Sequence, residues 1–282
     1  MNAGRRGAAL TLGSLALSLC AACGGDADSQ PEAEPAAAAQ APTSPPNAMA
    51  RALAGGGTVF VIRPSELTAE QGAWVAGVTD ADYVFTTLER GPWDVPSLRR
   101  FIEGMEAAAA AAPDSLATIP VLLRIPPLHE MDPDTARTRV AEALEAGVSG
   151  IIFPHVVSRE EIAQALDLLG PQGWPRNPAG SVVAVHMIED RASVENAREL
   201  VATPGVKVVF LGPMSLTSAF EDDSTAVEGA IQSVLAICRE TDVACGITAG
   251  AEDVAERVRQ GFRFLVVREQ AVLDAGRTAT GS

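Results

Sequence analysis

The chain has 282 residues, of which 47% are hydrophobic and 20% charged, a balance typical of a globular protein with a sizeable core. Its formal net charge is −15 at pH 7, and all but one of its 21 basic residues are arginine. This acidity argues against a nucleic-acid partner, because a phosphate backbone is bound by a basic face.

The first 23 residues have the features of a bacterial lipoprotein signal peptide with a lipobox. Two arginines precede the apolar run 8–19, which is too short to span a membrane readily. Small residues then lead to Cys23, so we expect this cysteine to carry the lipid. Cys20 stands where a lipobox usually has leucine, valine or isoleucine, and an uncleaved anchor or ordinary secretion are the alternatives.

Residues 24–54 are rich in alanine and proline and show no clear apolar periodicity. Such a segment cannot bury enough surface to order itself, so we predict a disordered tether. The sequence therefore predicts an exported protein of the bacterial cell envelope, anchored to a membrane through a lipid.

Residues 55–282 alternate short apolar runs with amphipathic segments. The predicted strands are 58–62, 82–87, 118–124, 150–153, 181–185, 207–211, 243–248 and 262–267. The predicted helices include 69–77, 95–112, 133–146, 159–169, 193–201, 226–240 and 251–260. Eight apolar strands alternating with helices predict an α/β protein with a closed (β/α)8 TIM barrel. No glycine-rich phosphate loop follows the first strand, which argues against a nucleotide-binding fold.

Glu189 and the turn 212–217 follow two consecutive predicted strands. A right-handed crossover brings the ends of both strands to one edge of a parallel sheet, where barrels of this kind carry their chemistry. A carboxylate facing backbone amides could hold a divalent metal and the oxygens of a small acid. Alternatively, Glu189 is a helix N-terminal charge that is favourable against the helix dipole.

Two cysteines fall within the predicted domain. Cys238 lies near the end of a predicted helix and Cys245 within the next strand. In an oxidising envelope they could form a disulfide, and the alternative is a pair of buried thiols. No zinc-ligand spacing is present.

Five motifs occur in order along the domain. They are Leu-Glu-Arg-Gly-Pro at 88–92, Leu-Arg-Ile-Pro at 123–126, Gly-Ile-Ile-Phe-Pro-His-Val at 150–156, Met-Ile-Glu at 187–189 and Phe-Leu-Gly-Pro-Met-Ser-Leu-Thr at 210–217. Together they resemble the HpcH/HpaI aldolase/citrate lyase family, metal-dependent pyruvate aldolases on a TIM barrel of the phosphoenolpyruvate/pyruvate-domain type.

The resemblance implies a divalent metal (Mg, Mn or Co) that chelates a keto acid and stabilises its enolate. By position, Glu189 matches a metal ligand and Arg124 the arginine that stabilises the oxyanion. Gly212 and Pro213 match the turn that receives the substrate carboxylate, and we place Ser215 in the same substrate-binding turn. The implied partner is a small anionic carboxylate ligand. A homo-oligomer is also implied, although the short tail after the last strand makes assembly through C-terminal helices doubtful.

Several family positions are changed in this sequence. The second metal ligand, an aspartate, falls on Ser215, and the proton-handling histidine and its aspartate fall on Arg90 and Thr87. The family's glutamine falls on Met187. A lone carboxylate is a poor Mg²⁺ or Mn²⁺ site, because these ions prefer several oxygens, so the metal is in doubt. Loss of a base near neutral pKa lowers a rate by about 10²–10⁴-fold.

Neighbouring residues could compensate for these changes. His155 and His186 lie at the ends of adjacent strands and His129 in a nearby loop; each is either a base or a packing histidine. The acidic run 221–223 is either a source of a metal ligand or a solvated surface.

Arg90 and Arg124 would make the mouth positive and favour an anionic ligand, and with His155 they are our catalytic candidates. Alternatively, Arg90 forms an ion pair with Glu89 or Asp94. Two functions follow. The first is a carbon–carbon lyase acting on hydroxy-keto acids through a pyruvate enolate. The second is a non-catalytic, envelope-anchored module that binds a small carboxylate.

Overall fold

The computed structural model describes residues 47–112 and 117–281. The predicted signal peptide, Cys23 and residues 24–46 of the predicted tether lie outside these ranges. No helix within the two described ranges has the length and apolar character needed to cross a membrane.

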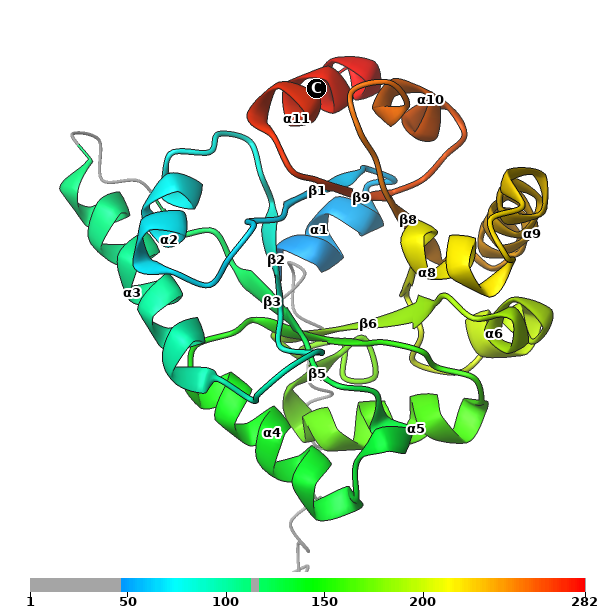
Figure 1. Ribbon diagram of the computed structural model, residues 1–282, viewed down its shortest axis with the longest axis horizontal. Coiled ribbons are helices and arrows are strands. Elements are labelled where there is room, and N and C mark those ends of the chain that lie inside the picture. Colours follow the sequence, from blue (N-terminus) through cyan, green and yellow to red (C-terminus); the bar gives the residue numbers. More distant parts are fainter. Residues whose placement is uncertain (1–46, 113–116, 282) are drawn as a thin grey trace, which may run out of the picture. The chain divides into compact units, whose positions relative to one another are not determined.

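Eight parallel strands form the centre of the domain (Figure 1). They are β1 (Val59–Ile62), β2 (Tyr83–Thr87), β3 (Val121–Arg124), β4 (Gly150–Phe153), β6 (Val182–Ile188), β7 (Val208–Leu211), β8 (Ala244–Thr248) and β9 (Phe264–Val267). Pairing of β1 with β9 and of β4 with β6 closes the ring. A short additional strand, β5 (Gly173–Trp174), pairs with β6. The predicted (β/α)8 TIM barrel is confirmed.

Helices surround the strands (Figure 1). They are α2 (Ala69–Ala76), α3 (Val95–Ala111), α4 (Pro133–Glu145), α5 (Arg159–Leu169), α6 (Arg191–Glu195), α7 (Ala197–Val201), α8 (Pro213–Ala219), α9 (Ser224–Thr241), α10 (Val254–Arg259) and α11 (Gln270–Thr280), with 3-10 turns at Leu128–Glu130 and Gly170–Gln172. Five of them, α2, α3, α4, α5 and α9, begin at a side-chain cap. The side chain of Asp132 accepts hydrogen bonds from two backbone amides of α4, and that of Ser158 accepts one from α5. The helix predicted over 193–201 is split into α6 and α7 at Asn196.

The core has two layers because side chains alternate along each strand. On β1, Phe60 and Ile62 pack outward against the helices. Val59 and Val61 point inward, into a separate cluster that fills the barrel. All four side chains are fully buried, so β1 reads as a continuous apolar run.

An additional helix, α1 (Ala48–Ala54), corrects the predicted tether. Met49 is fully buried in the interior cluster, and its backbone N–H donates to the hydroxyl of Tyr83, the first residue of β2, at 3.0 Å. Asn47 caps α1 and its side-chain amide donates to the carbonyl of Gly180 at 3.1 Å. The prediction of disorder through residue 54 is wrong for this segment. Seven helical residues are too few to be stable alone, and packing on the barrel supplies what the local sequence lacks.

Cys238 on α9 and Cys245 on β8 are both free and buried. The structure therefore has two buried thiols at these positions and not a disulfide. Burial raises the pKa of the Cys245 thiol well above its ordinary value, which keeps it protonated at neutral pH.

Candidate active site

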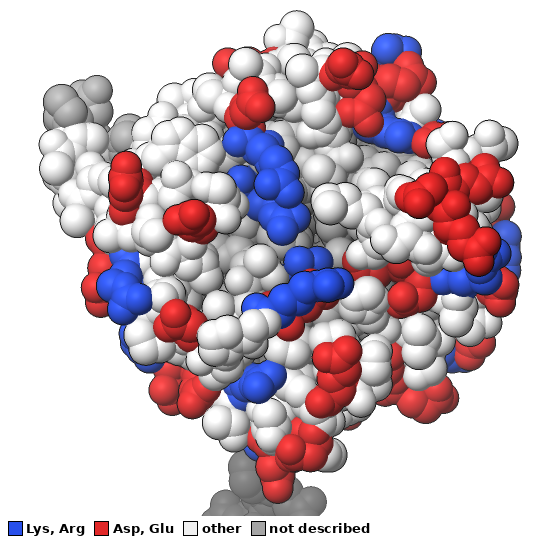
Figure 2. All heavy atoms as spheres, in the orientation of Figure 1, with Lys and Arg blue, Asp and Glu red and all other residues white. Residues whose placement is uncertain are grey.

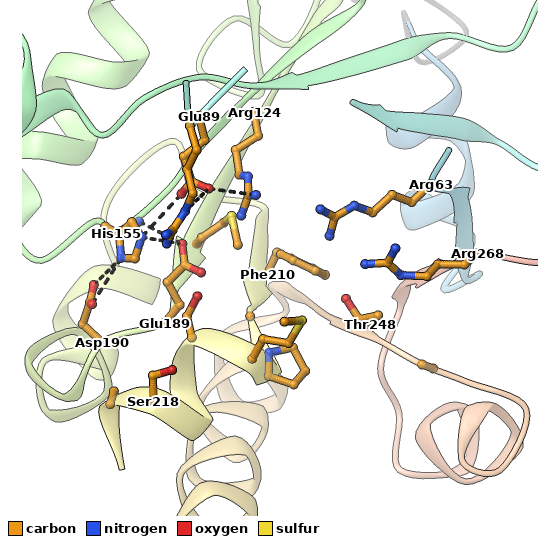
Figure 3. Close-up of a pocket in the computed structure, with 18 of the residues that line it drawn as sticks. Arg63, Glu89, Arg124, His155, Glu189, Asp190, Phe210, Ser218, Thr248 and Arg268 are labelled. Atoms are coloured by element: carbon orange, nitrogen blue, oxygen red, sulfur yellow. Dashed lines mark hydrogen bonds and ion pairs between the residues drawn. The ribbon is translucent and has the colours of Figure 1, made fainter. Parts of the chain in front are cut away.

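A cavity of about 900 Å³ opens at the C-terminal ends of the barrel strands (Figure 3). The crossover argument predicts that Glu189 and the turn with Ser215 share one mouth, and the family resemblance adds Arg124; all three residues line this cavity. The other predicted site residues that line it are Arg90, His155, Gly212 and Pro213.

Arg124 is the last residue of β3 and is held by the end of β2 and the loop that follows it. Its Nη2 lies 2.8 Å from Oε2 of Glu89, and its Nε donates to Oγ1 of Thr87 at 3.1 Å. The same Thr87 hydroxyl oxygen accepts the backbone N–H of Glu89 at 3.2 Å. Burial alone would raise the pKa of Glu89, but the contact with His155 and the charge of Arg124 outweigh burial and hold that pKa below its ordinary value.

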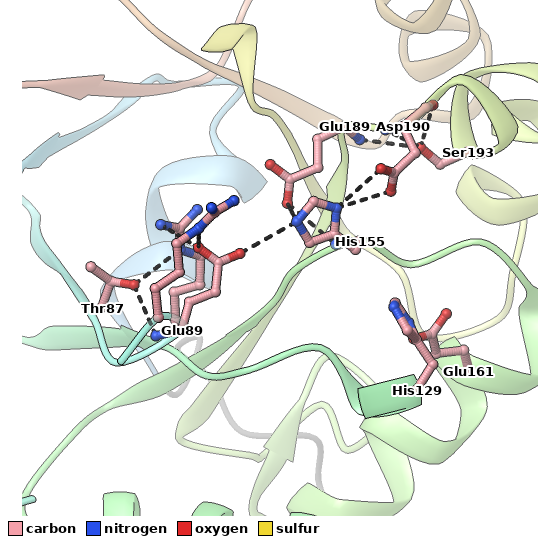
Figure 4. A network of polar contacts seen from close by, with 10 residues as sticks. Thr87, Glu89, His129, His155, Glu161, Glu189, Asp190 and Ser193 are labelled. Atoms are coloured by element: carbon pink, nitrogen blue, oxygen red, sulfur yellow. Dashed lines mark hydrogen bonds and ion pairs between the residues drawn. The ribbon is translucent and has the colours of Figure 1, made fainter. Parts of the chain in front are cut away.

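His155 lies between three carboxylates (Figure 4). Its Nδ1 lies 3.0 Å and 3.2 Å from the two carboxylate oxygens of Asp190, and its Nε2 lies 3.4 Å from Oε1 of Glu89 and 3.7 Å from Oε1 of Glu189. The contact with Glu89, with the charges of Glu189 and Asp190, raises the pKa of His155 to about 9 against the effect of burial. His155 has a φ of 53°, an uncommon backbone conformation that turns the residue after β4 toward these acids.

Glu189 is the most deeply buried acid of the cluster, with 1% of its side chain exposed. Burial raises its pKa above the ordinary value, although His155, the Ser215 hydroxyl and Arg124 oppose this effect. Gly212 packs directly on the carboxylate, because a Cβ at this position would lie 2.5 Å from Oε2 of Glu189. A side chain at residue 212 would therefore displace the carboxylate.

Two oxygens of this cluster are buried and have no hydrogen-bond partner among the described residues, namely Oε1 of Glu89 and Oε2 of Glu189. One ligand atom from each of Glu89, His155 and Glu189 can be chosen so that all lie within 4.8 Å of one another. Unpaired buried carboxylate oxygens are costly unless a cation satisfies them. Two carboxylates and an imidazole thus fit a divalent metal, which removes the objection that Glu189 is a lone ligand.

Arg90 makes the contact that the alternative interpretation predicts. Its side chain is 83% exposed, and its Nε lies 3.6 Å from Oε2 of Glu89 at the rim of the cavity. Asp94 instead caps α3, where its side chain accepts the backbone N–H of Ser97 at 3.0 Å.

The other compensating groups are not part of the cavity lining. His129 is half exposed, and its Nδ1 lies 3.1 Å from Oε1 of Glu161. Of the acidic run 221–223, Asp223 caps α9 and all three residues are exposed.

His186 is a packing histidine and not a base. It is fully buried, and its ring stacks on that of Phe153 with centroids 5.8 Å apart. Neither ring nitrogen has a hydrogen-bond partner among the described residues, and a weak contact with the backbone of Val208 offsets little of the cost. Burial therefore lowers the pKa of His186 to about 4.

This lowered pKa predicts an acid-sensitive fold. Between about pH 6.5 and pH 4 the unfolded chain protonates residue 186 and the folded chain does not, so stability falls as the pH falls through this window. The loss attributable to His186 is on the order of 3 kcal/mol. Urea unfolding of wild type and His186→Phe at pH 7.5 and pH 4.5 measures this loss as a difference in the free energy of unfolding. The variant should gain stability relative to wild type at the lower pH. An equal difference at both pH values would contradict the assignment.

Four residues at the mouth are missing from the sequence-based site. Glu89 is named there only as a partner of Arg90, while Asp190, Arg63 and Arg268 are not considered as site residues. All four line the cavity. Their common signal is that each follows, within five residues, the C-terminal end of a predicted strand.

Comparisons with known proteins identify relatives of this chain and of its fold. The model of the family described as HpcH/HpaI aldolase/citrate lyase matches residues 66–267. A hydroxypyruvate/pyruvate aldolase of Chromohalobacter salexigens is 27% identical over 221 residues, which cover 69% of this chain and 81% of that protein. The protein of the same name from Paraburkholderia phytofirmans is 25% identical over 164 residues, which cover 48% of this chain and 63% of that protein.

Solved structures support the same fold. The crystal structure of an HpcH/HpaI aldolase/citrate lyase family protein from Burkholderia cenocepacia J2315 superposes with a TM-score of 0.62. The match covers 79% of this chain and 93% of that one at 22% identity, so it supports the barrel fold and nothing further.

Proposed function

This chain belongs to the HpcH/HpaI aldolase/citrate lyase family, and from that premise we propose that it is a carbon–carbon lyase. Its substrates are hydroxy-keto acids. The hydroxyl group loses its proton as the bond between the keto-bearing and the hydroxy-bearing halves breaks, which releases an aldehyde and the enolate of a pyruvate-type acid, and the enolate then takes up a proton. The observation that carries the proposal is the cluster of Glu89, His155 and Glu189, with two unpaired buried oxygens, beside Arg124 in the mouth of the barrel.

Glu89, His155 and Glu189 would hold the divalent metal. Asp190 supports this assignment, because metal-binding histidines ordinarily direct their second ring nitrogen to a carboxylate, and Nδ1 of His155 lies 3.0 Å from Asp190. The Nε2 atom then lies 3.4 Å from the unpaired Oε1 of Glu89 and 3.7 Å from Oε1 of Glu189. When bound, the metal supplies Lewis acidity that favours ionisation of the keto acid toward its enolate.

Arg124 would stabilise the negative charge that develops on the keto oxygen as the carbon–carbon bond breaks. Its contacts with Glu89 and Thr87 fix the guanidinium before substrate arrives, so little reorganisation is needed in the transition state. Cation–π contact with Phe85, at 5.6 Å from the ring centroid, adds a second constraint.

The start of α8 would receive the carboxylate of the keto acid. Gly212, Pro213 and Ser215 line the same cavity as Arg124 and Glu189, which supports this role. Met187 and Phe210 form an apolar part of the lining beside these groups. An apolar wall excludes water and strengthens each electrostatic contact with the substrate.

Release of pyruvate from 4-hydroxy-2-keto acids tests the proposal. Purified protein treated with EDTA should be inactive, and added Mn²⁺ or Co²⁺ should restore pyruvate formation. A coupled lactate dehydrogenase assay measures the pyruvate. Absence of turnover with every metal tested, in a protein that still binds small carboxylates in EDTA, would favour the non-catalytic binding module instead.

A further inference from the structure

The wall of the cavity opposite Glu89 and Glu189 carries two more arginines, Arg63 and Arg268 (Figure 3). Arg63 directly follows β1 and Arg268 directly follows β9. Ile62 and Val267 are register partners of these parallel strands, so the two arginines extend from neighbouring strand ends. Their guanidinium groups point into the same space.

These two cations have no acidic partner in the described part of the chain. Among the described residues, no carboxylate lies within 4.0 Å of the guanidinium of Arg63 or Arg268, whereas Arg90 and Arg124 both contact Glu89. Arg63 is half-buried and stacks over the ring of Phe85 at 5.0 Å. Burial, together with the charges of Arg124 and Arg268, lowers the pKa of Arg63 to about 10. Arg268 is exposed, so the site combines one guanidinium held against Phe85 with one that is free to adjust, and an anion would relieve the repulsion between them.

The charge distribution of the whole face supports this interpretation. The chain carries a net charge of −15, yet four of its 21 basic residues line this one cavity; the three acids of the lining, Glu89, Glu189 and Asp190, belong to the cluster around His155 and not to the wall with Arg63 and Arg268. Figure 2 shows the basic side chains gathered around the hollow in the middle of the face, with acidic side chains mostly around its periphery. Such a field attracts anions to the mouth and concentrates them there.

The cavity also extends beyond these arginines. A neighbouring cavity of about 390 Å³ is lined by Arg63 and Arg268 together with residues of the β1–α2 and β2–α3 loops. The pair therefore lies where two cavities meet, on the side away from Glu189.

We propose that Arg63 and Arg268 form a second anion-binding subsite, which holds a terminal carboxylate or phosphate on the aldehyde half of the substrate. The proposal rests on the proposed function for the orientation of the substrate, whose keto-acid half lies at Glu189. Guanidinium groups bind either oxyanion through paired N–H donors, so both sources of the charge share this chemistry. The lyase would accordingly favour substrates with an acidic group at each end.

Anion binding tests the subsite without catalysis. Isothermal titration in EDTA compares wild type, Arg63→Gln and Arg268→Gln, with glutarate as the carboxylate probe and methyl phosphate as the phosphate probe. The control is Arg99→Gln, an exposed arginine on α3 outside the cavity lining. We expect at least one probe to bind wild type and the control alike, and each subsite variant to bind it at least tenfold more weakly. The probe that responds identifies the preferred oxyanion. Equal binding by the variants, or no binding of either probe to wild type at 10 mM, would overturn the subsite.

A kinetic comparison separates this proposal from the proposed reaction. Two substrates are compared: a 4-hydroxy-2-keto acid that bears the preferred terminal anion, and its uncharged analogue. The ratio of their kcat/KM values, charged over uncharged, should fall at least tenfold in Arg268→Gln. If wild type cleaves neither substrate but the variants lose anion binding, the reaction fails and the subsite stands. If wild type cleaves both and the ratio is unchanged in the variants, the reaction stands and the subsite fails.

Discussion

Glu189→Gln should lower kcat/KM for pyruvate release by about a thousandfold or more, equivalent to roughly 4 kcal/mol of transition-state stabilisation. The substitution keeps the shape of the side chain but removes the charge of the carboxylate at the centre of the proposed metal site. An amide oxygen is a weaker ligand for a hard divalent cation, so occupancy and rate should fall together. The coupled pyruvate assay at saturating Mn²⁺ measures the effect.

The same substitution should leave the fold intact or slightly stabilise it. Burial raises the pKa of Glu189 because it disfavours the charged form, and glutamine avoids the cost of burying a charge at this position. Thermal unfolding in EDTA should therefore give a melting temperature for Glu189→Gln at or above that of wild type. Glu195→Gln, on the exposed end of α6, is the matched control and should retain wild-type activity. Retention of a tenth or more of the wild-type rate by Glu189→Gln would rule out the proposed role.

Arg124→Lys should lower kcat/KM by about a hundredfold, the effect expected when one oxyanion-stabilising donor is lost. Lysine keeps the positive charge but cannot reproduce the planar group that contacts Glu89 and Thr87 at once. The loss should appear mainly in kcat, because the developing oxyanion is present only in the transition state.

Lysine is the informative replacement at this position because alanine would leave Glu89 without its nearest cation in a buried site. The control is Arg139→Lys, a half-buried arginine that stacks on Trp93 at 5.2 Å, outside the cavity lining. Steady-state kinetics should show the control within twofold of wild type. A similar small effect of Arg124→Lys would show that charge alone matters at residue 124.

The barrel could be predicted from the sequence because its strands are apolar on both faces. Each of the eight predicted runs contains or overlaps an observed barrel strand, and the differences lie at the ends. The strand predicted over 181–185 continues to Ile188, since His186 and Met187 are buried and remain in register with β7. The periodicity of helices and strands is a local property, so a single sequence carries it.

The elements missed by the sequence depend on contacts with the rest of the chain. Helix α1 owes its order to Met49, which fills the end of the barrel interior. Helix α8 was predicted as a turn, although Pro213 at its first position favours a helix start. Packing therefore decides α1, whereas α8 carries a local signal that the sequence analysis does not use.

The candidate site was predictable in its location but not in its ligand set. Strand-end topology brings Glu189 and Ser215 together, as the crossover argument requires, and Arg124 lines the same cavity, as the resemblance implies. Glu89 escaped attention because the order of residues cannot show that its carboxylate turns toward His155. The backbone φ of 53° at His155 turns this residue toward the carboxylate of Glu89. No periodic pattern in the sequence encodes such a φ value.

Binding of Mn²⁺ to the EDTA-treated protein, followed by electron paramagnetic resonance, tests the central claim most directly. The account predicts one bound ion per chain with a nitrogen ligand from His155, and at least tenfold weaker binding by Glu189→Gln and by Glu89→Gln. A wild-type protein that leaves Mn²⁺ free at millimolar concentration, or one whose binding is unchanged by both substitutions, would contradict it.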